Sequence, residues 1–294
     1  MEAEKGSFPV GLMAQVLGVS RSGFYSWLAR PERRGDPWAA LRAEVESLWA
    51  ASGGRWGART VRSQLPGEHA GATLYRVRKC MRELGIRGIH PRASRRTTVA
   101  DPAAAERPDL IRRDFSCPVP TAKLVGDITY LATGQGWLYM ATVIDLCTRM
   151  VVGLAFSERM TADLPIAALE SAWARGYVAE GAVFHSDRGS QYTSRAMAEW
   201  AERRGVRLSV GRTGSCHDNA VAESFFGTFK NEMYHLRSFA TRDEARAASV
   251  EYVEGYYNRR RPHSTIGYEI PARKMQAFFD RLDAALARPL PMAA

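Results

Sequence analysis

The chain has 294 residues, 46% of them hydrophobic, which is enough for about two ordinary domains with their own cores and excludes a disordered chain. Its 41 Lys and Arg outnumber its 31 Asp and Glu, giving a formal net charge of +10. Residues 1–98 carry 17 basic and 8 acidic side chains, so nearly all of the excess lies in the N-terminal third. This distribution favours nucleic acid as the partner, against the alternative of a basic surface kept for solubility.

The cysteine pattern fits a reducing compartment, and the hydropathy pattern bears on membrane spans and export signals. The four cysteines, at positions 80, 117, 147 and 216, form no C-x-x-C pair, so neither a zinc module nor a disulfide framework is indicated. The most apolar long segment, 137–156, contains Asp145 and Arg149, and the apolar stretch 8–19 lacks a basic leader and a cleavage site. No membrane span or export signal is predicted, and we expect a cytoplasmic, nucleoid-associated protein.

Residues 1–35 are predicted to form a helix-turn-helix-like DNA-binding segment. Apolar residues recur at helical spacing from 11 to 28, interrupted by a turn at Gly18, after which Ser20 is placed to cap a second helix. A helix-turn-helix presents its second helix to the major groove, which would expose Arg21 and Tyr25 to DNA. A plain helical hairpin needs the same turn and is the alternative.

A second helical unit, predicted to be a DNA-binding region, occupies residues 36–92. Its clearest helix is 73–84, whose buried side is Leu74, Val77, Met81 and Leu84. Arg76 and Lys79 lie on the exposed side and are assigned to DNA phosphates. The alternative for both is a solvated helix face.

Residues 93–119 combine arginines with prolines and show no periodicity, which predicts a basic, extended linker. The pattern then predicts strands at 124–131, 137–146, 151–156, 182–186 and 206–210, with helices at 163–175 and 194–204. Short turns join the first three strands, as in an antiparallel meander, whereas helices separate the later ones. We therefore predict an α/β domain with a mixed sheet flanked by helices at 120–275, and a C-terminal tail at 276–294.

Three acidic residues lie where a charge is costly or needs a partner. Asp127 interrupts the first apolar strand, Asp187 closes the fourth, and Glu223 lies in a helix predicted at 219–234. Carboxylates that converge from separate elements can hold two divalent cations about 4 Å apart, an arrangement that cleaves phosphodiesters. Crowding raises the pKa of at least one of them, so the site should be poorly formed without cations.

The helix that carries Glu223 places other polar residues on the same face. Asn219 comes four residues before Glu223 and Lys230 seven after it, with Gly227 between them leaving room for a DNA backbone. Asn219 and Lys230 are therefore assigned to DNA, with a solvated lysine as the alternative for Lys230. The other basic side chains assigned to DNA are Arg188, Arg259, Arg260 and Arg261.

Three strings of residues, in this order, carry a family resemblance. They are His-Ser-Asp-Arg-Gly-Ser-Gln-Tyr at 185–192, Asp-Asn-Ala-Val-Ala-Glu-Ser-Phe-Phe at 218–226 and Tyr-Asn-Arg-Arg-Arg-Pro-His-Ser at 257–264. With 35 residues between Asp187 and Glu223, the chain resembles the D,D-35-E transposases of bacterial insertion sequences. It is most similar to the large-reading-frame transposases of the IS three family, which are relatives of retroviral integrases.

The resemblance implies a ribonuclease H-like, integrase-type core at 120–275, in which Asp127, Asp187 and Glu223 are the catalytic residues and bind two Mg²⁺ ions, with Mn²⁺ as a substitute. It implies hydrolytic nicking at the element's ends, followed by attack of the freed 3′ hydroxyl on a target strand. The implied partners are the terminal repeats and target DNA, a second copy of the chain on paired ends, and the product of a preceding reading frame.

Other functions share some of these features. A metal-dependent nuclease without strand transfer would use the same three acids. A non-catalytic DNA-binding regulator derived from a transposase would keep the fold but is expected to have lost a carboxylate. A haloacid-dehalogenase-like phosphatase needs a second Asp two residues after Asp127, where this chain has Thr129.

Overall fold

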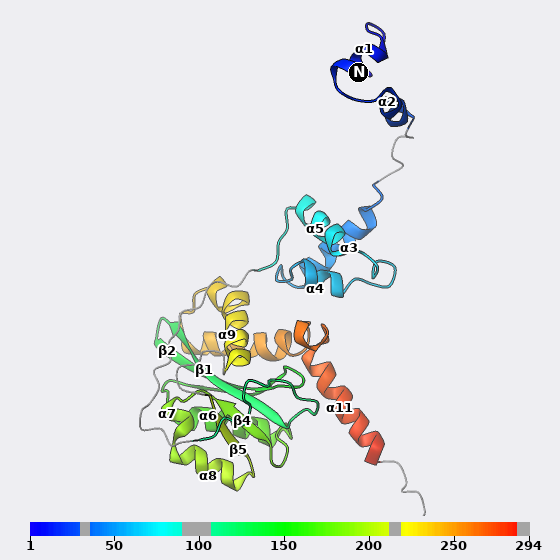
Figure 1. Ribbon diagram of the computed structural model, residues 1–294. Coiled ribbons are helices and arrows are strands. Elements are labelled where there is room, and N and C mark those ends of the chain that lie inside the picture. Colours follow the sequence, from blue (N-terminus) through cyan, green and yellow to red (C-terminus); the bar gives the residue numbers. More distant parts are fainter. Residues whose placement is uncertain (30–35, 90–106, 212–218, 287–294) are drawn as a thin grey trace, which may run out of the picture. The chain divides into compact units, whose positions relative to one another are not determined.

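A computed structural model describes residues 1–29, 36–89, 107–211 and 219–286, and the chain divides into two compact units at residues 87 and 88 (Figure 1). Within the described ranges, no helix is both long and apolar enough to cross a lipid bilayer. The predicted linker lies outside these ranges at residues 93–106, as does the end of the predicted tail, 287–294.

The first unit begins with two short helices, α1 (Val10–Val16) and α2 (Arg21–Leu28). Gly18 takes a left-handed conformation, with φ at 64°, that a residue with a side chain would adopt only at a cost. The Ser20 hydroxyl accepts a hydrogen bond from the Gly23 amide at 3.0 Å, so the predicted N-cap is confirmed.

The same unit contains a group of three helices, α3 (Ala39–Ala51), α4 (Ala58–Ser63) and α5 (Leu74–Glu83). Their shared core consists of Leu41, Val45, Val61, Leu65, Ala72, Val77, Cys80 and Met81. Helix α5 begins at Thr73, whose hydroxyl accepts a hydrogen bond from the Arg76 amide at 3.4 Å. Of the predicted buried side of this helix, Val77 and Met81 are buried, and Leu74 and Leu84 are half-buried.

The second unit is built on a five-stranded sheet with the order β3-β2-β1-β4-β5. The strands are β1 (Lys123–Thr133), β2 (Gly136–Asp145), β3 (Val151–Ser157), β4 (Val183–Ser186) and β5 (Arg207–Val210). The first three pair antiparallel, whereas β4 pairs parallel with both β1 and β5. The predicted mixed sheet is confirmed, and β1 lies at its centre.

Helices cover both faces of the sheet (Figure 1). Alternate side chains of each strand point to opposite faces, so the sheet contributes to two separate cores. One core joins the sheet to α9 (Ala220–Glu232), α10 (Arg242–Val250) and the π-helical turn η2 (Glu251–Tyr257). The other joins it to α6 (Asp163–Ala174), α8 (Arg195–Arg203) and α11 (Pro271–Leu286). Shorter elements are α7 (Ser190–Thr193), η1 (Tyr234–Leu236) and η3 (Ser264–Ile266).

Helix α10 is followed directly by a segment with a different winding. The Thr241 hydroxyl and the Glu244 carboxylate form a capping box at the start of α10. The α-helix ends at Val250 and the chain continues as the π-helical turn η2. A π-helical turn holds more residues than an α-helical one, so the side chains that follow point in directions that an uninterrupted α-helix would not give.

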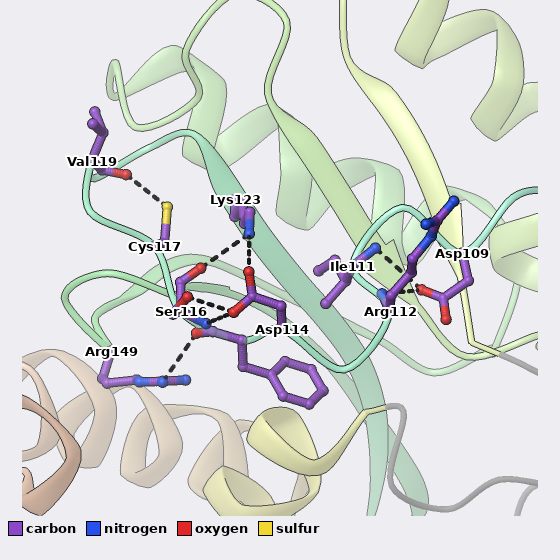
Figure 2. Close-up of polar contacts among 10 residues, drawn as sticks. Asp109, Ile111, Arg112, Asp114, Ser116, Cys117, Val119, Lys123 and Arg149 are labelled. Carbon is purple, nitrogen blue, oxygen red and sulfur yellow. Dashed lines mark hydrogen bonds and ion pairs between the residues drawn. The ribbon is translucent and has the colours of Figure 1, made fainter.

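Residues 107–119, predicted to belong to the linker, instead lie on the second unit (Figure 2). Ile111 is buried in one of the sheet's cores. The Asp109 carboxylate accepts hydrogen bonds from the amides of Ile111 and Arg112 at 3.1 and 2.7 Å, and the Lys123 ammonium reaches Asp114 at 3.2 Å. The linker prediction was wrong here because prolines and missing periodicity indicate an extended chain, which can equally well lie against a domain.

The predicted C-terminal tail is also partly structured. Helix α11 runs across the expected boundary at residue 275, with Met275 buried in the second core of the sheet. Phe279 packs against the same core, with its ring centroid 6.1 Å from that of Tyr177. Residues 276–286 therefore belong to the helical layer of the second unit.

Candidate active site

Asp127 and Asp187 lie side by side on neighbouring strands. In the parallel pairing of β1 with β4, Val125 lies opposite His185. Continuing this register by two residues brings Asp127 opposite Asp187, the first residue after β4. Paired parallel strands are about 4.8 Å apart and residues at the same level share a face, so the two carboxylates leave the sheet together.

Glu223 reaches the same region from a helix. It lies in the first turn of α9, which packs on the face of the sheet that holds Asp127. Asn219, the residue before α9, donates from its side-chain amide to the Gly126 carbonyl at 3.3 Å. This bond joins the start of the helix to the backbone directly before Asp127. Asn219, predicted to contact DNA, is buried, and its position makes it a support for the site.

The electrostatics of Asp127 show that the three acids act on one another. Its pKa is raised well above the ordinary value, first by burial, then by the charge of Asp187, and further by that of Glu223. A hydrogen bond from the Ile128 amide and the charge of Lys230 act in the opposite direction. The residues predicted from the sequence as a triad are thus electrostatically coupled through Asp127.

The polar atoms around Asp127 fit a hydrated divalent cation. Thr142 lies opposite Asp127 in the β1–β2 pairing, and its buried Oγ1 has no hydrogen-bond partner in the described part of the chain. The same holds for Oδ1 of Asn219 and Oη of Tyr192. Hard carboxylate oxygens surrounded by unsatisfied oxygens suit Mg²⁺, which keeps several waters when bound. Within the described ranges, however, no three acidic, His or Cys side chains already converge as a cation-binding group.

Tyr192 is a member of this site that the sequence analysis did not select. Its side chain is 3% exposed, and burial raises its pKa well above the ordinary value, as do the charges of Asp127 and Asp187. The only signal in the sequence is its place at the end of the string 185–192, five residues after Asp187. A tyrosine at that spacing is equally expected of a core residue.

Lys230 lies near the acids, as its helical spacing from Glu223 predicted. Burial lowers its pKa, and the charge of Asp127 acts against that shift. Its ammonium lies 4.9 Å from the centre of the Tyr130 ring. A Cβ atom at Gly227 would meet no other atom within 4 Å, so this part of the α9 surface is open.

The other residues of this unit that were predicted to bind DNA differ in their exposure and in their contacts within the unit. Arg259 and Arg260 are exposed. The Arg188 side chain donates from Nε to the Gly211 carbonyl at 2.8 Å. Arg261 is held inside the unit by the Glu232 carboxylate, with N···O distances of 2.8 to 3.1 Å. The assignment of Arg261 to DNA is therefore replaced by a structural role, because its guanidinium is committed to a buried carboxylate.

The N-terminal unit presents its basic side chains unevenly. Arg21, Tyr25 and Arg76 are exposed, as predicted. Lys79 packs over the Trp38 ring at 4.6 Å and lies 3.8 Å from Glu83, so its charge is partly used within the unit. The face of α5 opposite its buried side carries three residues that the sequence analysis did not assign to DNA, namely Tyr75, Arg78 and Arg82, all exposed.

Family models match both units of the chain. Two models described as "Integrase core domain" match residues 118–216 and 204–271, and one described as "HTH-like domain" matches residues 37–94. The helix-turn-helix-like match thus covers the three-helix group and not the segment 1–35.

Several known proteins are similar to the chain. It is 37% identical to the "Insertion element IS600 uncharacterized 31 kDa protein" of Shigella sonnei, over 88% of this chain and 96% of that protein. It is 36% identical to "Transposase InsF for insertion sequence IS3A" of Escherichia coli K12, over 91% and 94%. Among solved structures, a chain of a simian T-cell lymphotropic virus intasome aligns with a TM-score of 0.49 and 16% identity, covering 85% of this chain and 78% of that one.

Proposed function

This chain belongs to the IS3 family of insertion-sequence transposases, and we propose that it cuts and rejoins DNA at an active site made of Asp127, Asp187 and Glu223. The observation that carries the proposal is the coupling of these acids: the β1–β4 register, continued two residues past Val125 and His185, sets Asp127 opposite Asp187, and both other carboxylates raise the pKa of Asp127. Like charges held together are stabilised when cations neutralise them, so the arrangement favours a cation-dependent enzyme.

Asp127 and Asp187 are the residues we assign to hold Mg²⁺, with Mn²⁺ as a substitute, and Glu223 completes the set from α9. Two such ions, when bound, would neutralise the phosphodiester and stabilise both the attacking and the leaving oxygen. The protein itself supplies the placement of the carboxylates on the central strand and on a packed helix. Lys230 and the open surface at Gly227 would receive a DNA phosphate beside the acids.

The reaction has two steps of the same kind at this site. In the first, the oxygen of a water molecule attacks a phosphorus atom at the element's end, and the P–O bond to the 3′ oxygen breaks to leave a free 3′ hydroxyl. In the second, that hydroxyl attacks a phosphorus atom of the target strand, and a new phosphodiester forms as a target P–O bond breaks. Positioning and charge stabilisation are sufficient for both, so no protein nucleophile is required.

DNA recognition is assigned to the N-terminal unit. The exposed face of α5 combines Tyr75 with Arg78 and Arg82 at helical spacing, and Arg76 lies on a neighbouring side. Arg259 and Arg260 are the exposed cations that we assign to DNA on the catalytic unit. Because a transposition event joins two ends of one element, we further propose a homo-oligomer on paired ends, with the product of a preceding reading frame as an additional partner.

The test is an assay for cleavage and strand transfer on labelled DNA that carries the element's own ends, in Mg²⁺, comparing the parent with Asp187→Asn. We expect the parent to give nicked and joined products and the variant to give neither. The matched control is Asp243→Asn, which removes an 87% exposed carboxylate far along the chain and should leave both products unchanged.

Three outcomes contradict parts of this proposal. A folded Asp187→Asn variant that keeps parental activity would refute the assignment of the acids. Nicked but never joined products from the parent would favour a nuclease without strand transfer. Binding of the ends without either product would favour a non-catalytic regulator.

A further inference from the structure

The hydroxyl of Tyr192 is buried and has no hydrogen-bond partner in the part of the chain that the structure describes. The ring is 3% exposed, and its centroid lies 6.0 Å from that of the fully buried Phe184. Among the described residues, nothing donates to or accepts from its Oη. Since leaving a buried hydroxyl unpaired is unfavourable, a phenylalanine would satisfy the packing better. Packing alone therefore does not explain why this position holds a tyrosine and not a phenylalanine.

The backbone around Tyr192 is firmly held, so this side chain does not turn away easily. The Arg107 guanidinium donates to the carbonyls of Tyr192, Thr193 and Ser194 at 2.6, 3.3 and 3.2 Å. The Tyr192 amide in turn donates to the Gly189 carbonyl at 3.0 Å. These bonds hold the short helix α7, and with it the backbone of Tyr192, in place.

Geometry places the Tyr192 ring beside an acid. A Cβ atom built on Gly189 would lie 3.1 Å from Asp187 Oδ1 and 3.8 Å from Cδ2 of Tyr192, so both side chains border the same small space. The Gly189 amide donates to that same Asp187 oxygen at 3.0 Å. Asp127, opposite Asp187, is the other acid whose charge acts on the tyrosine.

We propose that Tyr192 is a positioning residue, whose hydroxyl donates a hydrogen bond to the Asp127–Asp187 carboxylate pair when that pair holds a divalent cation. A carboxylate that gives one oxygen to a cation keeps a second oxygen free to accept, and such supporting bonds orient the ligand. Because the backbone is held and the hydroxyl has no partner among the described residues, this donor is available to a carboxylate that shifts toward it when the cation binds. The inference rests on the proposed function, because it requires the acids to bind a cation.

The test is the variant Tyr192→Phe, which removes one oxygen and retains the ring. Mn²⁺ binding to the full-length chain is measured by isothermal calorimetry, together with the thermal midpoint in the absence of cation. We expect the dissociation constant for Mn²⁺ to rise about 10- to 100-fold, and the cation-free midpoint to be unchanged or higher. The matched control is Tyr252→Phe, because the Tyr252 hydroxyl donates to Glu232 at 2.8 Å. That variant should lose thermal stability and keep parental Mn²⁺ affinity.

Each other outcome overturns the inference. If Tyr192→Phe binds Mn²⁺ as the parent does, the hydroxyl has no role in placing the acids. If its cation-free midpoint falls as in the control, the hydroxyl already has a structural partner. If the parent chain, measured alongside Asp187→Asn, binds no Mn²⁺, the proposed cation site fails and this inference fails with it. If the parent binds Mn²⁺ and only the effect of Tyr192→Phe is missing, this inference fails alone.

Discussion

Replacing Arg261 by alanine tests whether the run of three arginines at 259–261 serves one purpose or two. Arg261 forms a bidentate pair with Glu232, and their side chains are 22% and 10% exposed. Burial acts to lower the pKa of Arg261, but the hydrogen bond and charge of Glu232 outweigh it and raise that pKa above its ordinary value. The pair therefore stabilises the charged arginine inside the fold.

The expected loss follows from the burial of the pair. Removing one partner of a buried ion pair costs about 3–5 kcal/mol, because the other charge is left uncompensated. The partial exposure of Arg261 places this variant near the lower end, at about 3 kcal/mol. For a unit of this size, that corresponds to a fall in thermal midpoint of roughly 6–12 °C. Arg260→Ala removes an exposed side chain and should change the stability by less than about 0.5 kcal/mol.

The assay is urea unfolding of both variants and the parent, alongside the salt dependence of DNA binding. We expect Arg261→Ala to lose stability and Arg260→Ala to bind DNA more weakly with a shallower salt slope. A double variant, Arg261→Met with Glu232→Leu, should recover much of the lost stability because no charge is left buried. A loss below about 1 kcal/mol in Arg261→Ala, or equal losses in the two single variants, would refute the structural role.

Three further changes test the packing and electrostatics of the second unit. Gly126→Ala should cost about 1–3 kcal/mol in urea unfolding, because its Cβ would lie 2.3 Å from Cζ of the buried Phe184; parental stability would contradict the packing. Burial and then nearby arginines lower the pKa of His263 to about 4. Because the unfolded chain takes up the proton first, the free energy of unfolding should fall by up to about 3 kcal/mol as the pH falls from 6.5 to 4. His263→Asn should flatten that part of the stability–pH curve, and an unchanged slope would contradict the cause. Gly227→Ala should stabilise α9 by about 0.5–1 kcal/mol yet weaken DNA binding, and unaltered binding would show that no backbone approaches there.

The sheet could be predicted because its strands follow from local patterns, and the same patterns led to the acids that we propose as the site. Strand β1 reads as an apolar run of the right length, and a charge inside such a run is costly enough that Asp127 indicates a site. Glu223 was selected because it lies in a helix whose buried side is marked by the phenylalanines that follow it. These inferences need only neighbours in the sequence.

The parts that failed depend on contacts between distant residues or on an irregular turn. The three arginines at 259–261 look alike in sequence, and only the π-helical turn η2 decides which of them faces Glu232. Residues 107–119 carry no periodicity, so their attachment through Ile111 depends on a core assembled from elements far along the chain. The hydrophobic pattern carries no information about the orientation of these arginines or about the attachment of residues 107–119.

Tyr192 shows the same limit within the active site itself. Its ring fits the apolar pattern of a core residue, and only the assembled fold brings its side chain close enough to Asp127 and Asp187 for their charges to raise its pKa. Thr142 Oγ1 and Asn219 Oδ1, which have no hydrogen-bond partner among the described residues, lie on neighbours of the same strand. A folded chain normally satisfies such groups, so their presence where the charges of Asp187 and Glu223 act on Asp127 indicates a region that lowers the stability of the fold. A bound cation with its waters would satisfy the charges and the orphaned oxygens together, which is why cation binding and stability should be linked in this chain.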